Sequence, residues 1–517
     1  MQPEQLFNCM KKYIKKEWVI CFFSAVFFGL AAHLFKITNF IPNWDSLLNL
    51  YNDQNKTNLG RCFLGFACSF STYYDLPWIN GFLSLIYVGL SAVCVSELFE
   101  IKSRISLVLI GGLMATFPTV TSTLAYNYTA DGYFLALLCM CLAVIVCVRF
   151  YRRLLLAAVL IAFGLGIYQA YITFAMMLML IYLVDELLFK HINMKQFWTM
   201  SYRFAVCGVL GGIGYWLSMK ITVYISGMQL SEYQNIDKSF SLQEMNFFYS
   251  ALRAGYKFLK YFFDFSNGIN LFLIINIILF LGLSILFLYS FWVQKTYRQF
   301  WRILLTGMCL IAIPFASYAL YFVNPILDYH NLMVMCLCLI YILPVLFYER
   351  LSELSDRMFI IKQWGILGLS ALTIFNFILI ANISYQKLYM SYGKSYGVII
   401  RLADRIEQLP GALECNKLAV IGCLPGSESI SVDFPPDMTG ITDDYIIRKQ
   451  DTMMQENVTQ AMLQDYCGIT FEDTTEDDIR AVCKKEEFSQ MNEWPEQNSV
   501  SIIGDILVVN FGGEKDE

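Results

Sequence analysis

Charged residues are scarce in this chain. Only 15% of the 517 residues are Asp, Glu, Lys or Arg, whereas 57% are hydrophobic and the mean hydropathy is +0.52. An ordinary soluble domain carries about 25% charged residues. The composition therefore excludes a soluble protein and predicts a polytopic membrane protein. Because Lys and Arg cluster in short gaps between apolar runs and the net charge is −5, nucleic acid is not expected as a partner.

Groups that carry soluble chemistry are also few. There are three histidines, too few for a His-rich metal site, and no P-loop, GxGxxG, GxSxG or HExxH pattern. Nucleotide-driven transport and soluble-type hydrolysis therefore have no support, and neither a metal nor another cofactor is predicted. Most of the 16 cysteines lie in or near apolar runs, where a thiol acts as a small hydrophobe. Those of the polar tail could pair or stay as thiols: Cys415, Cys423, Cys467 and Cys483.

Apolar runs predict the fold. A membrane-crossing helix needs about 20 mostly apolar residues. The runs that meet or approach this length are about 18–36, 79–98, 105–122, 132–149, 169–187, 204–226, 269–293, 303–323, 331–348 and 362–383. The shorter run 154–165 is interpreted as an additional crossing packed inside protein, which need not match the full bilayer thickness. The predicted fold class is an all-α polytopic membrane protein with about 11 transmembrane helices.

Basic residues predict the orientation. With the N-terminus in the cytoplasm, the inner segments hold most of the Lys and Arg, as the positive-inside rule requires, and the excess alternates at every gap. Omitting the 154–165 crossing would invert every later loop. The first run follows a basic stretch without a small-residue cleavage site and is interpreted as a signal anchor in the plasma membrane.

Four polar segments then fall on the outer side: 37–78, 119–131, 226–268 and 324–331. In the third, aromatic residues and the cations Arg253, Lys257 and Lys260 recur at helical spacing. This pattern predicts a helix in the interface plane, with its rings in lipid and its cations towards phosphates.

The chain from residue 386 to 517 is polar and predicts an α/β domain on the extracytoplasmic side, after a transmembrane domain over 1–385. Its predicted elements are an amphipathic helix near 387–408, a strand at 417–422, a loop region rich in Pro, Gly and Asp, a helical stretch at 474–488 and a hairpin at 499–511 that turns at Gly504 and Asp505.

Two acids stand out on the outer side. Asp45 follows Trp44 in the first loop, where partial burial would let it accept a proton from an attacking hydroxyl. Its alternative is a solvated loop acid or an N-cap of the helix that follows. Asp131 lies at a helix mouth and is either an N-cap or a second acid that lines an active site. Asp53 and Asp75 lie at no comparable position in the sequence, and neither is predicted to be catalytic.

Other outer residues are candidates for substrate binding. Arg61 and His330 could hold a phosphate. Alternatively, Arg61 could snorkel to the lipid headgroups and His330 could bond a turn carbonyl. Tyr168 and Gln169 could bond a sugar, or they could satisfy backbone groups at a helix break. The predicted substrate-binding residues are Trp44, Arg61, Tyr168, Gln169, Lys257, Asp328 and His330, and no metal ligand is predicted.

Short motifs in a fixed order connect these residues with a known family. They are PNWD (42–45), LGR (59–61), DLPWINGFL (75–83), YTADGYFLAL (128–137) and GIYQA (166–170). In this order the chain resembles the GtrII-type polytopic glucosyltransferases, within the class of membrane glycosyltransferases with the GT-C fold. The resemblance covers about residues 15–385.

The resemblance implies transfer of a sugar, glucose, from a polyprenyl-phosphate donor to a cell-surface polysaccharide or a lipid-linked glycan. It also implies that Asp45 is the base and that neither a nucleotide nor an obligatory metal takes part. The alternatives are a glycan polymerase, which would make long chains, and a lipid-linked sugar flippase or other transporter, which would make no glycosidic bond.

Overall fold

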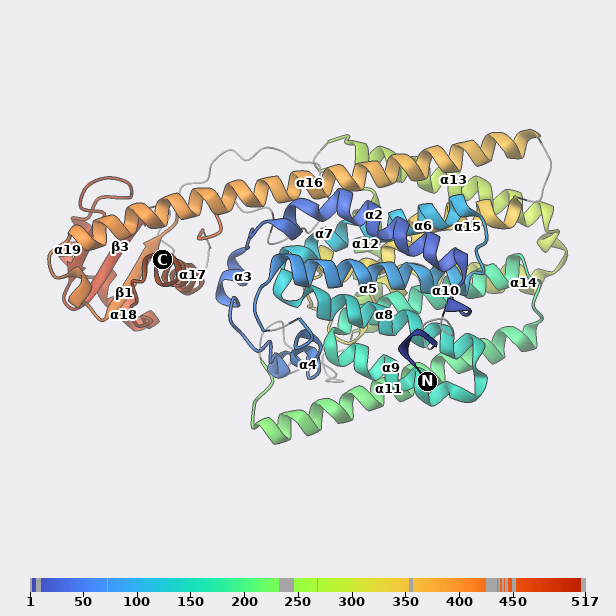
Figure 1. The fold of residues 1–517 in the computed structure, drawn as a ribbon, viewed down its shortest axis with the longest axis horizontal. Coiled ribbons are helices and arrows are strands. Elements are labelled where there is room, and N and C mark those ends of the chain that lie inside the picture. Colours follow the sequence, from blue (N-terminus) through green and yellow to red (C-terminus); the bar gives the residue numbers. More distant parts are fainter. Residues whose placement is uncertain are drawn as a thin grey trace. The chain divides into compact units, whose positions relative to one another are not determined.

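A computed structural model of the chain describes residues 2–5, 11–71, 73–231, 246–266, 268–352, 357–424, 435, 438, 441, 445–448 and 452–512. These residues are mostly helical and include a small three-stranded sheet (Figure 1). The chain divides into two units, which are described separately. Unit 1 comprises Met1–Asn39, Asn52–Asn382 and Asp433–Met438, and unit 2 comprises Phe40–Tyr51, Ile383–Val432 and Thr439–Glu517.

Nine helical spans among the described residues are long and apolar enough to cross a membrane. They are Lys16–Thr38 (α2), Pro77–Leu98 (α5), Arg104–Ala125 (α6, Arg104–Thr116, and α7, Pro118–Ala125), Asn127–Arg149 (α8), Gln169–Leu188 (ending in α10, Ile172–Leu188), Met194–Ser226 (α11), Leu271–Val293 (α13), Phe300–Ser317 (α14) and Lys362–Gln408 within α16 (Arg357–Gln408). These spans confirm that the chain is built as a polytopic membrane protein.

The other two predicted crossings coincide with shorter helices. The run 154–165 lies in α9 (Leu154–Ile167) and the run 331–348 ends in α15 (Cys338–Leu351), each of 14 residues. The total of 11 crossings and the GT-C fold stay predictions.

Small residues let the helices of unit 1 approach closely. Helix α2 packs against α5 and α6, α5 against α8, and α9 against both α8 and α11. At Gly111 of α6, a Cβ atom would lie 2.7 Å from the carbonyl oxygen of Cys21 in α2, and at Gly211 of α11 it would lie 2.5 Å from Ile161 of α9. Membrane helices associate through such close contacts because lipid gives them no hydrophobic driving force.

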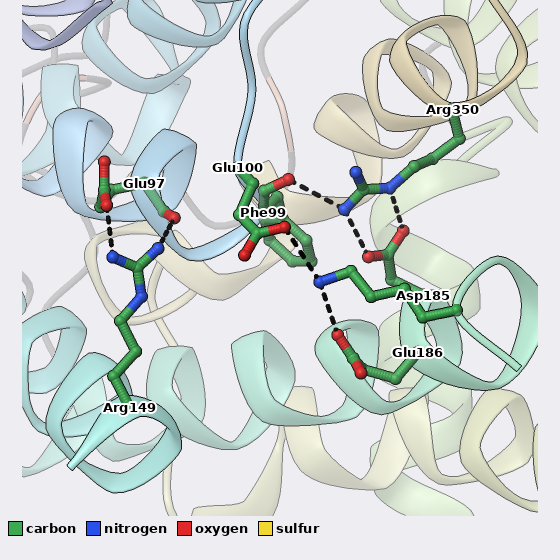
Figure 2. A network of polar contacts seen from close by, with 8 residues as sticks. Glu97, Phe99, Glu100, Arg149, Asp185, Glu186 and Arg350 are labelled. Carbon is green, nitrogen blue, oxygen red and sulfur yellow. Dashed lines mark hydrogen bonds and ion pairs between the residues drawn. The ribbon is translucent and has the colours of Figure 1, made fainter. Parts of the chain in front are cut away.

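Ion pairs join several helix ends of unit 1 (Figure 2). The Arg350 guanidinium donates to the Asp185 carboxylate at 2.6 and 2.8 Å and to the Phe99 carbonyl at 2.8 Å, while Lys190 Nζ lies 2.9 Å from Glu186 and 3.2 Å from Glu100. Nearby, Glu97 accepts a hydrogen bond from Arg149 (Figure 2). It also accepts hydrogen bonds from Lys15 and Trp18. We call these residues the ion-pair network.

The ion-pair network fixes the direction of α9. Helices α8 and α10 both finish in segments that reach the network, so the chain between them must return to the other end of the unit. At that other end, the Phe63 N–H donates to the carbonyl of Gly166 in α9 at 2.8 Å. The run predicted as a short crossing is therefore a helix that runs between the two ends of unit 1.

Helix α12 (Phe247–Phe262) occupies the described part of the predicted interfacial segment. Its N-cap is Asn246, whose side chain accepts from the Tyr249 N–H. Large apolar side chains are exposed along one face, as at Phe248, Leu252 and Leu259. This pattern agrees with the predicted amphipathic helix. The part of the segment at 232–245 and residue 267 lie outside the described residues.

Unit 2 contains the sheet. Strand β1 (Lys417–Gly422) pairs in parallel with β3 (Ile506–Gly512), and β2 (Val500–Ile503) pairs antiparallel with β3, in the order β1-β3-β2. The predicted strand and hairpin are confirmed. Side chains of the strands, such as Ala419 and Val508, share a buried core with Val482 and Phe488 from α18 (Glu476–Cys483) and α19 (Glu486–Ser489).

Two features of unit 2 differ from the prediction. The crossing at 362–383 and the amphipathic helix at 387–408 are one uninterrupted helix, α16 (Figure 1). Helix α17 (Thr452–Cys467) was not predicted at all, and the short helix α3 (Trp44–Leu48) packs against it.

Two short segments of unit 1, α4 (Leu64–Cys68) and the 3-10 turn Thr57–Leu59, complete the opening loop. The tail cysteines are thiols.

Candidate active site

The polar segments predicted to lie outside gather at the end of unit 1 away from the ion-pair network. Each of them contacts another through a main-chain group. The hydrogen bonds run from the Ser231 N–H to Asn58 O (2.9 Å), from the Thr119 hydroxyl to Asn331 O (2.7 Å) and from the Arg253 guanidinium to Pro325 O. The prediction that these four segments share one end of the bundle is therefore confirmed for their described parts in unit 1.

Two buried carboxylates lie at this polar end. Asp75 is 8% exposed and Asp131 is 1% exposed. The Asn127 amide donates to Asp75 Oδ1 at 2.6 Å, and the Asn80 amide donates to Asp131 Oδ1 at 3.2 Å. Asn127 and Asp131 are four residues apart in α8 and thus share one face of that helix. The two carboxylates are therefore held against the same helix face.

Neighbouring elements hold these carboxylates in place. Asn80, in the first turns of α5, accepts the Leu76 N–H at its Oδ1 (3.1 Å), which turns its amide nitrogen towards Asp131. Lys36, in the last turn of α2, is 2% exposed and interacts electrostatically with Asp75. A buried cation beside a buried carboxylate compensates a charge that would otherwise be costly there. We call Lys36, Asp75, Asn80, Asn127 and Asp131 the carboxylate cluster.

Neither predicted acid is an N-cap. Helix α8 begins at Asn127 and has Tyr126 at its N-cap position, so Asp131 lies a full turn inside the helix. Helix α3 begins at Trp44, and its N-cap is Asn43, whose Oδ1 accepts the Ser46 N–H at 2.8 Å. The N-cap alternatives for Asp131 and Asp45 are therefore wrong.

Asp45 and Trp44 belong to unit 2 and are partly buried. The Asp45 carboxylate accepts a hydrogen bond from the Asn49 amide at 3.0 Å, one turn further along. This contact gives the carboxylate a defined orientation in the first turn of α3. The structure thus places the two predicted catalytic acids in different units, Asp45 in unit 2 and Asp131 in unit 1.

Arg61 lies beside a pair of stacked tyrosine rings at the polar end. Its Nη1 donates to the Tyr133 hydroxyl at 2.6 Å, and its guanidinium carbon is 5.6 Å from the ring centre of Tyr133 and 5.3 Å from that of Tyr168. The two tyrosine rings stack at 4.0 Å. Cation–π contacts of this kind hold a guanidinium without neutralising it. These contacts give the Arg61 guanidinium a defined orientation, whereas phosphate binding by Arg61 stays a prediction.

Gln169 fixes the loop that carries Arg61. Its amide donates to the Leu59 carbonyl and to the Tyr215 hydroxyl, both at 3.1 Å, and the Tyr215 hydroxyl donates to the Gly60 carbonyl at 3.0 Å. Gly60 has φ of 72°, a left-handed conformation that favours glycine. Gln169 therefore satisfies backbone groups, one of its two predicted roles, whereas sugar binding by Tyr168 and Gln169 stays a prediction.

The turn at 324–331 lies beside α12. The Arg253 guanidinium of α12 donates to the carbonyl of Pro325 in this turn. Just before the turn, the ring centre of Tyr321 is 4.6 Å from Arg253, and the Tyr318 hydroxyl donates to the Lys257 carbonyl at 3.4 Å. His330 Nδ1 is 3.9 Å from Asp328 Oδ2, and the Asp328 side chain is 64% exposed. Asp328 and His330 thus lie close together in this turn, whereas the contact given for Lys257 is through its main-chain carbonyl.

The sequence analysis missed most of the carboxylate cluster. Lys36, Asp75, Asn80 and Asn127 had no assigned role, although a lysine at the end of an apolar run is itself unusual. Among the residues that the structure describes, no group of three or more His, Cys, Asp or Glu side chains is placed to hold a metal ion. The described side chains of this polar end include carboxylates, amides, cations and tyrosines.

A family model described as Glucosyl transferase GtrII matches residues 34–348 of the chain. The match covers more than half of the sequence and contains the whole carboxylate cluster, Asp45 and Arg61. No curated protein and no solved structure matches the chain.

Proposed function

Because the chain belongs to the GtrII glucosyltransferase family, we propose that this membrane glucosyltransferase takes glucose from a polyprenyl-phosphate donor. The acceptor is a cell-surface polysaccharide or a lipid-linked glycan, and transfer occurs on the extracytoplasmic side of the plasma membrane. No nucleotide and no obligatory metal takes part. The N-terminus then lies in the cytoplasm and the C-terminal α/β domain lies outside.

The observation that supports this proposal is the carboxylate cluster, buried at the polar end of an otherwise apolar bundle. Ionisable groups at membrane depth are costly and are retained where they are paired or have a function. A prenyl chain would hold its phosphate-linked sugar at the level of the helix ends. The polar end is thus where a lipid-anchored sugar and protein carboxylates can meet.

The proposed reaction is a single displacement. An acceptor hydroxyl attacks the anomeric carbon, its oxygen forms the new glycosidic bond, and the bond from that carbon to the phosphate oxygen breaks. The electron pair of the broken bond leaves with the prenyl phosphate, and the hydroxyl proton passes to a carboxylate base. Since the phosphate already carries charge, the protein needs one base and cations beside the leaving group.

Asp45 of unit 2 is the proposed base, and Asp131 of unit 1 is a second proposed catalytic acid. Asp45 lies on a short helix with its carboxylate oriented by Asn49, as a base requires. Arg61, held beside two stacked tyrosine rings, is the proposed cation for the phosphate. The other proposed substrate contacts are Trp44, Tyr168, Gln169, Lys257, Asp328 and His330.

The proposal is tested with the purified chain in liposomes, polyprenyl-phosphate glucose and glycan from the producing cells. Asp45→Asn should lower kcat by about 100-fold or more, because general-base catalysis contributes about 10²–10⁴. The matched control is Asp53→Asn in the same loop. The Asp53 carboxylate accepts a hydrogen bond from the Asn55 N–H at 2.9 Å. The side-chain oxygen of an asparagine can accept the same bond, so full activity is expected.

The products separate the alternatives. Single glucose branches support the proposal, whereas long chains would indicate a polymerase. Movement of the lipid-linked sugar across the bilayer without a new glycosidic bond would indicate a transporter. Full activity of Asp45→Asn would remove Asp45 from the role of base, and transfer from a nucleotide sugar without any prenyl phosphate would overturn the proposed donor.

A further inference from the structure

Unit 2 contains a group of aromatic rings that no step of the proposed reaction uses. Tyr392 and Tyr396 come from α16, Tyr466 from α17 and Phe40 from the segment before α3. The ring centres of Phe40 and Tyr392 are 6.2 Å apart, those of Tyr392 and Tyr396 are 6.4 Å apart, and those of Tyr396 and Tyr466 are 5.4 Å apart. We call these four residues the aromatic cluster.

Hydrogen bonds hold part of the aromatic cluster in place, and two of its rings are exposed. The Tyr392 hydroxyl donates to the Tyr466 hydroxyl at 2.9 Å, which joins α16 to α17. Behind the rings, Ser395 of α16 is buried and its hydroxyl accepts the Ile446 N–H at 2.9 Å. In contrast, Phe40 is 37% exposed and Tyr396 is 42% exposed. Rigid rings with open faces are what an amphipathic ligand stacks on.

The chemistry of the aromatic cluster differs from that of helix α12, which is predicted to lie at the lipid surface. The exposed face of α12 carries Phe248, Leu252 and Leu259 next to a row of cations, which suits acyl chains and phosphates. The aromatic cluster instead offers three tyrosines, whose rings are apolar and whose hydroxyls are polar. A sugar ring has the matching character, with C–H faces that stack on rings and hydroxyls at its rim.

The aromatic cluster is also close to the proposed base within unit 2. Phe40 precedes Asp45 by five residues, so their Cα atoms are at most about 18 Å apart. Helix α3, which carries Asp45, packs against α17, which carries Tyr466. A glycan chain of a few sugars bound on the rings could therefore extend to Asp45.

We propose that the aromatic cluster binds the acceptor glycan and presents one of its hydroxyls to Asp45. This proposal rests on the proposed function, because only a transferase with a glycan acceptor needs such a subsite. Tyr396 is the specificity-determining contact through its ring face. Tyr392 and Tyr466 position that ring.

Direct binding tests the proposal. The full chain is placed in lipid nanodiscs without donor and titrated with glycan from the producing cells, freed of lipid by mild acid. Tyr396→Ala should weaken binding about tenfold, the loss expected for one aromatic contact. Tyr396→Phe keeps the ring and should bind like the wild type. Tyr224→Ala, which removes an 89% exposed tyrosine of unit 1, is the matched control and should leave the Kd unchanged.

Kinetics with polyprenyl-phosphate glucose give the second readout. Tyr396→Ala should raise the acceptor KM about tenfold and leave the donor KM unchanged. An unchanged Kd for Tyr396→Ala, a defect of Tyr396→Phe as large as that of Tyr396→Ala, or no binding to the wild type would overturn the proposal. A raised donor KM with an unchanged Kd would also overturn it and assign the rings to the lipid surface.

The two proposals fail separately. If the wild type binds the lipid-free glycan through Tyr396 but transfers no sugar from polyprenyl-phosphate glucose, the proposed donor is wrong and the acceptor site stands. If transfer proceeds and Tyr396→Ala changes neither the Kd nor the acceptor KM, the acceptor site alone is wrong.

Discussion

The buried carboxylates of unit 1 are held by amides as well as by charge. Asn80 donates to Asp131 and Asn127 donates to Asp75, so each acid has a neutral donor with a fixed orientation. A neutral donor orients a carboxylate while leaving its charge in place, whereas a bidentate Arg pair would neutralise it. The described carboxylates of the ion-pair network are instead each bonded to a Lys or Arg side chain, which is why the carboxylate cluster is the candidate site.

In unit 2 a titratable group gives a prediction about pH. Hydrogen bonds from Lys417 and Thr475 lower the pKa of Asp478 from its ordinary 3.8 to about 2. The folded pKa is below the unfolded one, so this carboxylate stabilises the fold above about pH 4, and that contribution is lost as the pH falls towards about 2. Asp478→Asn should therefore lower the melting temperature of unit 2 in the full chain at pH 7, by calorimetry, and make no difference near about pH 2.

The control for this prediction is Asp477→Asn. The Asp477 side chain is 93% exposed and lies 3.7 Å from Arg480, so its loss should leave the melting temperature unchanged at both pH values. A destabilisation by Asp478→Asn that is as large at low pH as at pH 7 would show that the carboxylate charge is not its cause.

Single residues of the site were predictable only where local pattern marks them. Asp131 at a helix mouth and Arg61 in a loop beside aromatic residues were found in this way. Lys36 and Asp75 were not, because their significance depends on the contacts of α2, α5 and α8, which bring together residues far apart in the sequence. The N-cap alternative for Asp131 was wrong because the residues before it, predicted as loop, are helical in α7 and α8.

Among the elements, the contact between α9 and α11 gives a second prediction. A Cβ atom at Gly211 would lie 2.5 Å from Ile161 Cγ2 and 3.1 Å from the carbonyl oxygen of Ala158. Gly211→Ala should therefore separate the two helices and lower the free energy of unfolding by about 1–3 kcal/mol. Thermal stability of the detergent-solubilised chain, followed by size-exclusion chromatography, measures the loss.

The next residue supplies the matched control. A Cβ atom at Gly212 would meet no atom within 4 Å, so Gly212→Ala should be neutral or slightly stabilising, as alanine favours helix. Equal effects of the two substitutions would mean that α9 and α11 are not packed at Gly211.

The ion-pair network gives a third prediction (Figure 2). Asp185 is 4% exposed and receives two hydrogen bonds from Arg350, so Arg350→Met would leave a buried charge uncompensated. The expected loss is about 3–5 kcal/mol of unfolding free energy. Arg350→Met combined with Asp185→Asn should recover most of it, because the second change removes that charge. Thermal denaturation of the four chains in a double-mutant cycle measures the coupling.

An exposed pair is the comparison. Arg480 and Glu476 have side chains 67% and 72% exposed, and Arg480→Met should cost less than about 1 kcal/mol. A small effect of Arg350→Met, with no recovery in the double variant, would contradict the role given to the buried pair.

Elements were predictable where apolar runs are long, and less so elsewhere. A clear pattern of hydrophobic residues marked the spanning runs, the strand at 417–422 and the hairpin. The break expected in α16 is absent because its second half continues with a buried stripe, Leu388, Val398 and Leu402, on the same helical period. Helix α17 has no strongly apolar face in its sequence, and so nothing marked it.

At the scale of the whole molecule, the two ends of unit 1 differ in chemistry. One end holds the ion-pair network, rich in Lys and Arg, and the other holds the carboxylate cluster, tyrosines and Arg61. The positive-inside rule predicts that the first end lies in the cytoplasm. Within unit 1, the predicted inner and outer segments separate to opposite ends, so labelling one segment at each end tests the predicted orientation.

Labelling of intact cells with a membrane-impermeant maleimide assigns the sides. Cys483, an exposed cysteine of unit 2, should react in the wild type, and Cys483→Ser should lower the labelling to the level given by the partly exposed cysteines. In the Cys483→Ser background, Asn58→Cys in the opening loop should react from outside, whereas Lys102→Cys, between α5 and α6, should react only after permeabilisation. The opposite pattern would put the carboxylate cluster in the cytoplasm, where a sugar donor on the outer leaflet could not reach it.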